Sequence, residues 1–72
     1  MKTKYIVNFS KYFLTGNLKG LMLECSISFP TLDLASEYVN WTHEHVDKPM
    51  QSIIVGSLYT THNARIEVAN GN

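Results

Sequence analysis

A nine-residue stretch in which apolar and mostly polar side chains alternate is the feature that most constrains this fold. Residues 21–29 carry two alternating sets, the odd positions Leu21, Leu23, Cys25, Ile27 and Phe29 and the even positions Met22, Glu24, Ser26 and Ser28. Successive side chains of a strand point to opposite faces, so this period of two predicts a half-buried β-strand with the odd residues in the core. Pro30 ends the strand, because proline cannot donate to a strand ladder.

The N-terminal segment shows the same period. Tyr5, Val7 and Phe9 alternate with more polar residues and predict a strand over residues 3–10. The glycines and asparagine within residues 15–20 accept positive φ, so this segment is predicted to be a hairpin loop. Phe13 would join the core only if the first strand continues beyond its predicted end or bulges near Lys11 and Tyr12.

A helix is predicted after the second strand. Thr31 can cap its free amides, and Asp33 in the first turn complements the positive end of the helix dipole. The helix should run from Leu32 to about Val46 or Asp47, before Pro49. At about 100° per residue, one arc is apolar and packs on the sheet, whereas the opposite arc is acidic. The acidic arc is read as a solvated surface, with docking of a basic partner as the alternative.

The C-terminal third predicts two more strands. Residues 51–60 are rich in β-branched and aromatic side chains and are expected to form a third strand, with Gly56 marking a bulge or a close backbone approach. A turn at 61–63, a short fourth strand at 64–68 and a frayed tail at 69–72 follow. The whole chain, 1–72, is therefore a single α+β domain, a four-stranded antiparallel sheet (ββαββ) with one helix packed on one face.

Composition limits the classes of protein that this chain can belong to. Hydrophobic residues make up 44% and charged residues 17%, which is typical of a folded globular domain and not of disorder or membrane residence. The single cysteine and the absence of a long apolar N-terminal run predict a cytoplasmic protein with no membrane association.

Charges are segregated along the chain although they cancel overall. Residues 1–23 hold four lysines and no acid, for a net +4, and residues 24–48 hold five acids and one lysine, for a net −4. Such polarity bears on surfaces and partners and not on the fold.

The residues that commonly carry chemistry do not form a recognisable set. His43 and His45 are two positions apart on the predicted helix and point about 200° from each other, so they cannot chelate one ion together. Cys25 is expected in the core, where cysteine is usually inert, although His45 could approach it beneath the helix. We therefore predict no catalytic or metal-binding residues and no cofactor, and expect the protein not to be an enzyme.

The sheet face opposite the helix is the candidate for function. Apolar side chains on that face would be exposed, and a large apolar patch on a folded protein usually marks a partner, whereas scattered apolar residues are normal. Trp41, at the edge of the apolar arc, either completes the core or anchors a partner. The predicted interface residues are Ile6, Tyr12, Met22, Ile54, Leu58 and Trp41.

These features favour a small non-enzymatic protein-binding module, an adaptor or inhibitor of the kind found among bacteriophage accessory and anti-defence proteins, which covers a target surface and forms a homodimer or higher oligomer. One alternative is an oligomer that sequesters a small ligand or nucleotide through Lys19, Thr60, Thr61 and Arg65. The other is nucleic-acid binding by interleaved lysines and aromatic residues near the N-terminus, which the zero net charge disfavours.

Overall fold

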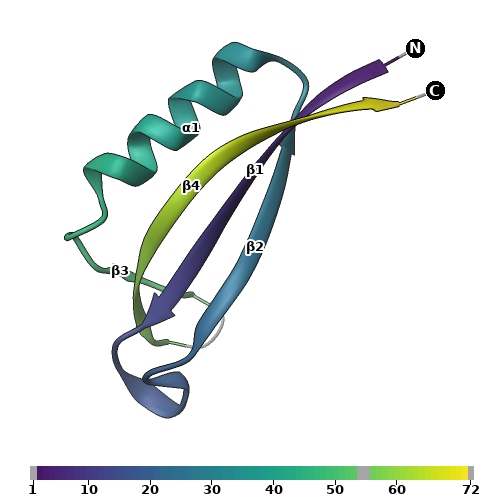
Figure 1. The fold of residues 1–72 in the computed structure, drawn as a ribbon. Helices are drawn as coiled ribbons and strands as arrows, with labels where there is room; N and C mark the ends of the chain where they lie inside the picture. The colour runs from purple at the N-terminus through teal and green to yellow at the C-terminus, as the bar shows by residue number, and fades with distance from the viewer. Residues whose placement is uncertain (1, 54–55, 72) are drawn as a thin grey trace.

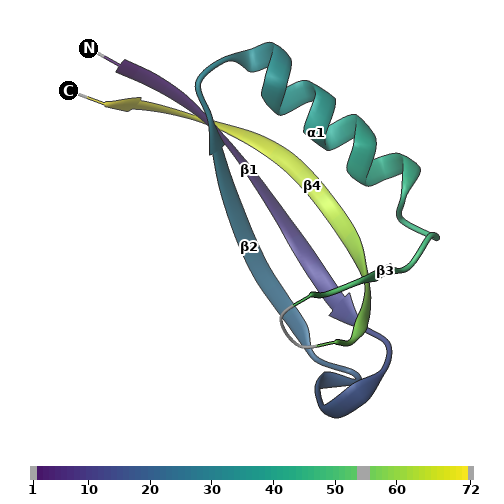
Figure 2. The same ribbon diagram turned by 180° about the vertical axis from the view of Figure 1, so that it is seen from behind.

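One helix lies on one face of a four-stranded antiparallel sheet in the computed structural model, which describes residues 2–53 and 56–71 (Figures 1 and 2). In chain order the elements are β1 (Lys2–Phe13), the 3-10 helix η1 (Gly16–Leu18), β2 (Met22–Phe29), α1 (Leu32–Glu44), β3 (Met50–Gln51) and β4 (Leu58–Gly71). The strands lie in the order β2-β1-β4-β3, so the two longest strands are central. The α+β class and the ββαββ order are confirmed.

Strand β1 is longer than predicted and continues to Phe13. The hairpin to β2 is closed by the Phe13 N–H, which donates to the Leu21 carbonyl at 3.0 Å, and by the Gly20 N–H, which donates to the Phe13 carbonyl at 2.9 Å. Gly16 and Gly20 have φ values of 78° and 89°, as expected for glycines in this loop. Phe13 is buried, because the longer strand keeps it on the side of the sheet that faces the helix.

Helix α1 begins as predicted and ends earlier. The Thr31 hydroxyl accepts a hydrogen bond from the Leu34 N–H at 3.2 Å, which satisfies one free amide of the first turn. The helix ends at Glu44, and not at Val46 or Asp47, because His45 leaves the helical backbone and its Nδ1 lies 2.8 Å from the Trp41 carbonyl oxygen.

The predicted turn at 61–63 is wrong, because β4 runs through it without reversing. Asn8 pairs with Arg65 and Ser10 pairs with His62, so two residues of β4 lie opposite the single residue Phe9, as in a β-bulge. The extra residue is Asn63, whose φ is 57°. Asn63 adopts the positive φ for which a turn was predicted, but here this φ forms a bulge within a continuous strand.

The predicted strand at 51–60 is mostly absent, since β3 contains two residues, and 58–60 belong to β4. Gly56 lies in the connection between them with a φ of 69°, and its N–H donates to the Ser52 carbonyl at 2.8 Å. Residues 54 and 55 lie outside the described residues. The tail predicted to fray is paired instead, because Ala69 and Asn70 lie opposite Lys4 and Thr3 of β1.

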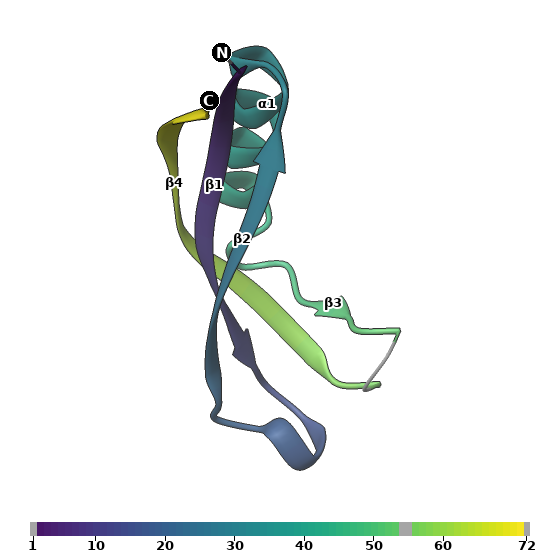
Figure 3. The ribbon, with the colours of Figure 1, turned by 90° about the vertical axis from the view of Figure 1, so that its right-hand side faces the viewer.

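The core is small and lies off the centre of the sheet. Val7, Phe9, Ala35 and Ala64 form its buried cluster, and the Tyr38 ring packs on it, with its centroid 5.6 Å from that of Phe9. Figure 3 shows the helix behind the upper part of the sheet, and α1 contacts β1 and β4 more than β2.

The odd-numbered face of β2 is therefore not the buried face that the alternation predicted. Leu21, Leu23 and Ile27 are 44%, 46% and 37% exposed, whereas Cys25 and Phe29 are half-buried. A helix is about 10 Å wide and neighbouring strands lie about 4.8 Å apart, so one helix covers about two strands. The strand at the edge remains partly uncovered on both faces.

Candidate protein-binding surfaces

Three of the predicted interface residues lie near one another on the sheet face opposite the helix. Met22 of β2 pairs with Tyr12 of β1, which pairs with Thr60 of β4, and Leu58 lies two residues before Thr60 on the same side. Tyr12, Met22 and Leu58 are 36%, 54% and 38% exposed. We call these three residues the uncovered-face patch, which crosses three strands of one sheet.

The other predicted interface residues do not join this patch. Ile6 is half-buried and lies six residues from Tyr12 along β1, which is about 20 Å. Trp41 lies on α1, on the opposite side of the sheet, where its ring stacks on those of Tyr38 and His45 at centroid distances of 5.8 Å and 4.4 Å. Ile54 lies outside the described residues.

Polar side chains separate Ile6 from the uncovered-face patch. The Ser26 hydroxyl donates to Asn8 Oδ1 at 2.5 Å, and Asn8 Nδ2 donates to Glu67 Oε1 at 3.0 Å, so one chain of hydrogen bonds crosses β2, β1 and β4. One step nearer the patch, the Ser10 hydroxyl donates to the Glu24 carboxylate. These hydrogen bonds place paired polar side chains in the middle of the sheet face opposite the helix, so the uncovered-face patch has a polar border on the side of Ile6.

A hydroxyl–imidazole pair on the same face was missed by the sequence reasoning. The Thr60 hydroxyl lies 2.6 Å from His62 Nε2, and Ser10 faces His62 from the neighbouring strand. An imidazole beside a hydroxyl is the arrangement that activates a nucleophile. Here Thr60 and Ser10 are 7% and 5% exposed and the Ser10 proton is directed to Glu24, so the contacts serve to satisfy polar groups in the sheet.

The residues predicted to hold a small ligand are not brought together. Thr60 and Thr61 are consecutive in β4, so their side chains point to opposite faces, and Thr61 is 1% exposed. Lys19 lies in the β1–β2 hairpin, whereas Arg65 Nη1 donates to the carbonyl of Asn63, two residues before it in β4, at 3.5 Å.

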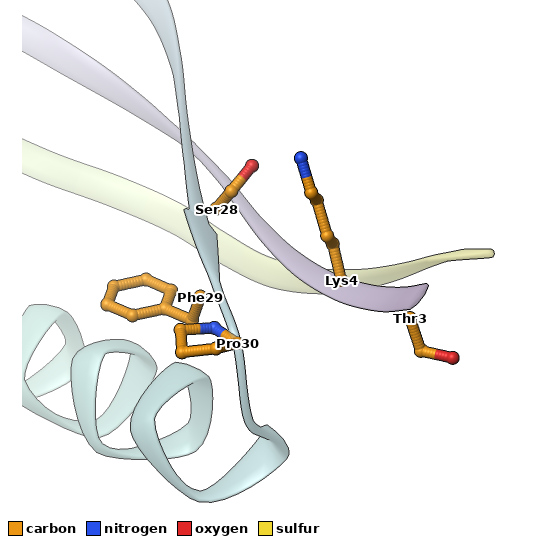
Figure 4. A pocket seen from close by; sticks show the side chains of 5 residues that line it. All are labelled: Thr3, Lys4, Ser28, Phe29 and Pro30. Atoms are coloured by element: carbon orange, nitrogen blue, oxygen red, sulfur yellow. The ribbon is translucent and has the colours of Figure 1, made fainter. Parts of the chain in front are cut away.

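A depression of about 480 Å³ lies elsewhere, where β2 leaves the sheet (Figure 4). Because the chain turns away at Pro30, the first residues of β1 lose their neighbour on that side. In Figure 4 the side chains of Lys4 and Ser28 point away from the helix, and those of Phe29 and Pro30 lie towards it. Among its lining residues Lys4 carries the single charge, and the site follows from where β2 ends rather than from a sequence motif.

A second apolar surface lies on the helix side of β2. The Phe29 and Tyr38 rings are 5.5 Å apart, and Trp41 stacks on Tyr38, so this side of α1 faces the exposed side chains of β2. We define the β2–α1 surface by its exposed members, Leu21, Leu23, Ile27, Leu34 and Trp41. Sequence reasoning assigned these residues to the core or its edge, since the alternation of a strand does not indicate what covers it.

The side chains that could carry chemistry are in contact with other groups of the chain. Cys25 is half-buried and its Sγ lies 3.9 Å from the Leu23 carbonyl oxygen, while the His45 ring stacks on Trp41. Burial raises the pKa of the Tyr38 hydroxyl, with smaller contributions from Tyr59 and Cys25. Within residues 2–53 and 56–71, no three His, Cys, Asp or Glu side chains are grouped so that they could hold a metal ion.

No protein-family model, curated protein or solved structure matched the chain. In the described part of the chain, no helix combines the length and the apolar character needed to cross a membrane. Its function is therefore inferred from its own surfaces.

Proposed function

We propose that the protein is a non-enzymatic protein-binding module that covers a surface of its target with the uncovered-face patch. The observation that carries this proposal is that, among the described residues, many more large apolar side chains are exposed than fully buried. Among the described residues the larger buried hydrophobic side chains are those of Val7, Phe9 and Phe13. Twelve large ones in the described part of the chain are exposed, namely Tyr12, Leu21, Met22, Leu23, Ile27, Leu32, Leu34, Trp41, Val46, Ile53, Leu58 and Val68.

The uncovered-face patch has the properties of an interface centre. Each Å² of apolar surface removed from water contributes about 25 cal/mol. One partner can bury adjacent side chains together, so their contributions add in a single interface, whereas those of scattered side chains do not. Tyrosine and methionine are both enriched in protein interfaces. The hydrogen-bonded polar residues beside Tyr12 and Met22 supply a rim, and the paired strands β2, β1 and β4 support the patch.

The mode of action that fits this patch is to bind a target protein and cover part of its surface. A patch on an open sheet face can cover another protein without a cavity or a moving part. We therefore propose that the protein acts as an adaptor or inhibitor, the role of many small accessory and anti-defence proteins of bacteriophages.

Affinity capture with surface variants tests this proposal. The tagged chain and its Tyr12→Glu and Leu58→Glu variants are incubated with an extract of the cells in which the protein acts. The matched control is Leu32→Glu, which places the same new charge at a 49% exposed apolar residue in the first turn of α1, where an acid is favourable.

We expect the wild type and Leu32→Glu to retain the same discrete protein, and Tyr12→Glu and Leu58→Glu to retain at least about tenfold less, because a buried unpaired charge costs more than 1.4 kcal/mol. Circular dichroism confirms that each variant is folded. Equal retention by all four chains would show that the patch is not the binding surface.

A further inference from the structure

Strand β2 has an open hydrogen-bonding edge along its whole length, since none of the described strands pairs with its outer side. It is the outermost strand of the sheet and pairs with β1 without a register shift from Met22 to Phe29. The Phe13 N–H donates to the Leu21 carbonyl, so the odd-numbered residues of β2 direct their backbone groups towards β1. By the alternation of an antiparallel ladder, the even-numbered residues 22, 24, 26 and 28 direct theirs outward.

This edge lacks the features that usually protect a strand from pairing. Protected edges are short, bulged, covered, or carry proline or lysine. Strand β2 has eight residues without a bulge, proline or lysine, and its one charged side chain, Glu24, is engaged by Ser10 on the uncovered face. At the opposite edge of the sheet, β3 pairs only with Leu58 and Tyr59 in the described part of the chain, and the rest of the outer side of β4 is interrupted by the bulge at Asn63.

The residues beside the open edge indicate what pairs with it. On the helix side, Leu23 and Ile27 of β2 are exposed, and so is Trp41 of α1, whose ring stacks on Tyr38, which in turn packs on Phe29 of β2. An added strand would extend the core if its side chains on that side were apolar and those on the other side were small or polar. The strand with this pattern is β2 itself.

We propose that two copies of this chain pair through β2 in antiparallel orientation, about a two-fold axis at Cys25. The product is one eight-stranded sheet with both helices on the same side. This dimer uses the edge of β2 and the β2–α1 surface, and it does not depend on the proposed function of the uncovered-face patch.

The position of the axis follows from which pairs each register creates. An axis at Cys25 places Glu24 opposite the partner's Ser26 and Met22 opposite the partner's Ser28. All four outward residues of each copy are then paired, giving eight backbone hydrogen bonds. On the helix side, Leu23 meets the partner's Ile27.

Neighbouring registers are less favourable. An axis at Glu24 would place two carboxylates directly opposite each other, which destabilises a strand pair. An axis at Ser26 would place Met22 opposite the partner's Pro30, which has no N–H to donate. The zero net charge of the chain adds no long-range repulsion between copies, so the occupant that fits the edge in pattern and charge is a second copy.

The dimer places both uncovered-face patches on one side of the joined sheet. Because Met22 lies opposite the partner's Ser28, the two Met22 residues are six positions apart along the paired strands, about 20 Å. The assembly would therefore present two equivalent patches to a target.

Oxidative cross-linking of the one cysteine tests the register directly. Facing residues of a non-hydrogen-bonded antiparallel pair have Cα atoms about 4.5 Å apart, which lies within the range that a disulfide spans. Diamide accepts the two hydrogens when two thiols join. The matched control carries Cys25→Ser and Ser28→Cys, whose sulfurs would be about 20 Å apart in this dimer.

We expect wild-type chains at micromolar concentration to form a covalent dimer at least about tenfold faster than the control. Equal rates, or no covalent dimer from the wild type, would overturn the Cys25 register.

The mass in solution tests the open edge separately. Ser26→Pro removes an outward N–H while leaving the ladder to β1 intact, whereas Ser26→Ala removes the hydroxyl that bonds Asn8 and keeps the N–H. Light scattering should give twice the chain mass of 8.2 kDa for the wild type and Ser26→Ala, and 8.2 kDa for Ser26→Pro.

A monomeric wild type, or a dimer unaffected by Ser26→Pro, would refute pairing through β2. Neither result would alter capture by the uncovered-face patch, since Tyr12 and Leu58 are not on β2, so the two proposals fail independently.

Discussion

Two valines on the helix side of the sheet test where the core lies. Val7 in β1 has no exposed surface, whereas Val68 in β4 is 57% exposed, although both lie on the same side, since Val68 pairs with Tyr5. Val7→Ala and Val68→Ala delete the same two methyl groups from residues of β1 and β4. Strand propensity spans only about 1 kcal/mol, so a larger difference between the variants reports burial.

The expected difference can be worked out from these exposures. Removing two buried methyl groups costs about 1.6 kcal/mol in transfer free energy, and the residual cavity brings the total for Val7→Ala to about 2 to 3 kcal/mol. Val68→Ala should cost about 0.5 kcal/mol, the usual effect at a surface site. A domain of this size has a total stability of about 3 to 5 kcal/mol, so Val7→Ala should leave the chain barely folded at 25 °C.

Urea unfolding followed by circular dichroism at one fixed chain concentration measures both variants. With a slope near 1 kcal/mol/M, their midpoints should differ by about 2 M. Equal midpoints would refute an off-centre core beneath α1, because they would mean that Val7 and Val68 are buried to the same extent.

Three further predictions follow from individual residues. Gly16→Ala should lower the stability by about 1 to 2 kcal/mol in urea unfolding, because φ is 78° there and the new Cβ would lie 2.5 Å from Ser57 Oγ; an unchanged midpoint would contradict that contact. Thr61→Val should raise the stability by about 1 kcal/mol, since the buried Thr61 hydroxyl has no hydrogen-bond partner in the described part of the chain. The control Thr42→Val should lower the stability, because the Thr42 hydroxyl donates to the Tyr38 carbonyl at 2.9 Å. A loss of stability in both variants would show that the Thr61 hydroxyl is hydrogen-bonded. Because the pKa of the Tyr38 hydroxyl is raised in the folded protein, this group adds stability that is present below the unfolded pKa of about 10 and is lost as the pH rises through the higher folded pKa. The urea midpoint should therefore fall above pH 10 more steeply in the wild type than in Tyr38→Phe. Parallel curves would contradict burial of the hydroxyl.

Local signals in the sequence predicted the elements that depend on neighbours along the chain. The alternation of residues 21–29 gave the second strand, and Thr31 gave the start of the helix through its hydroxyl. Both depend on backbone geometry within a few residues, so they did not require knowledge of the tertiary structure.

The errors arose where a distant strand determines the structure. Asn63 signals positive φ, but its neighbours continue as a strand because β4 pairs with β1 on both sides of the bulge opposite Phe9. Likewise, the alternation placed Leu23 and Ile27 on the correct side of the sheet, yet their exposure depends on where one helix lies over four strands.

The candidate surfaces were predictable in part. Tyr12 and Met22 could be placed on the uncovered face from their even positions, and the hairpin register brought them together. The grouping of Leu58 with them, and the exclusion of Ile6, depend on the β1–β4 register and on the hydrogen bonds around Asn8. The β2–α1 surface follows from an incomplete core, which no local pattern indicates.

Site-specific photo-cross-linking in living cells tests the proposed function most directly. A benzophenone amino acid is placed at Tyr12 in one chain and at Leu32 in another, both exposed positions, one inside and one outside the uncovered-face patch. Protein binding through the patch predicts one discrete cross-linked protein from position 12 and none from position 32. Equal cross-linking from the two positions, or none from position 12, would contradict it.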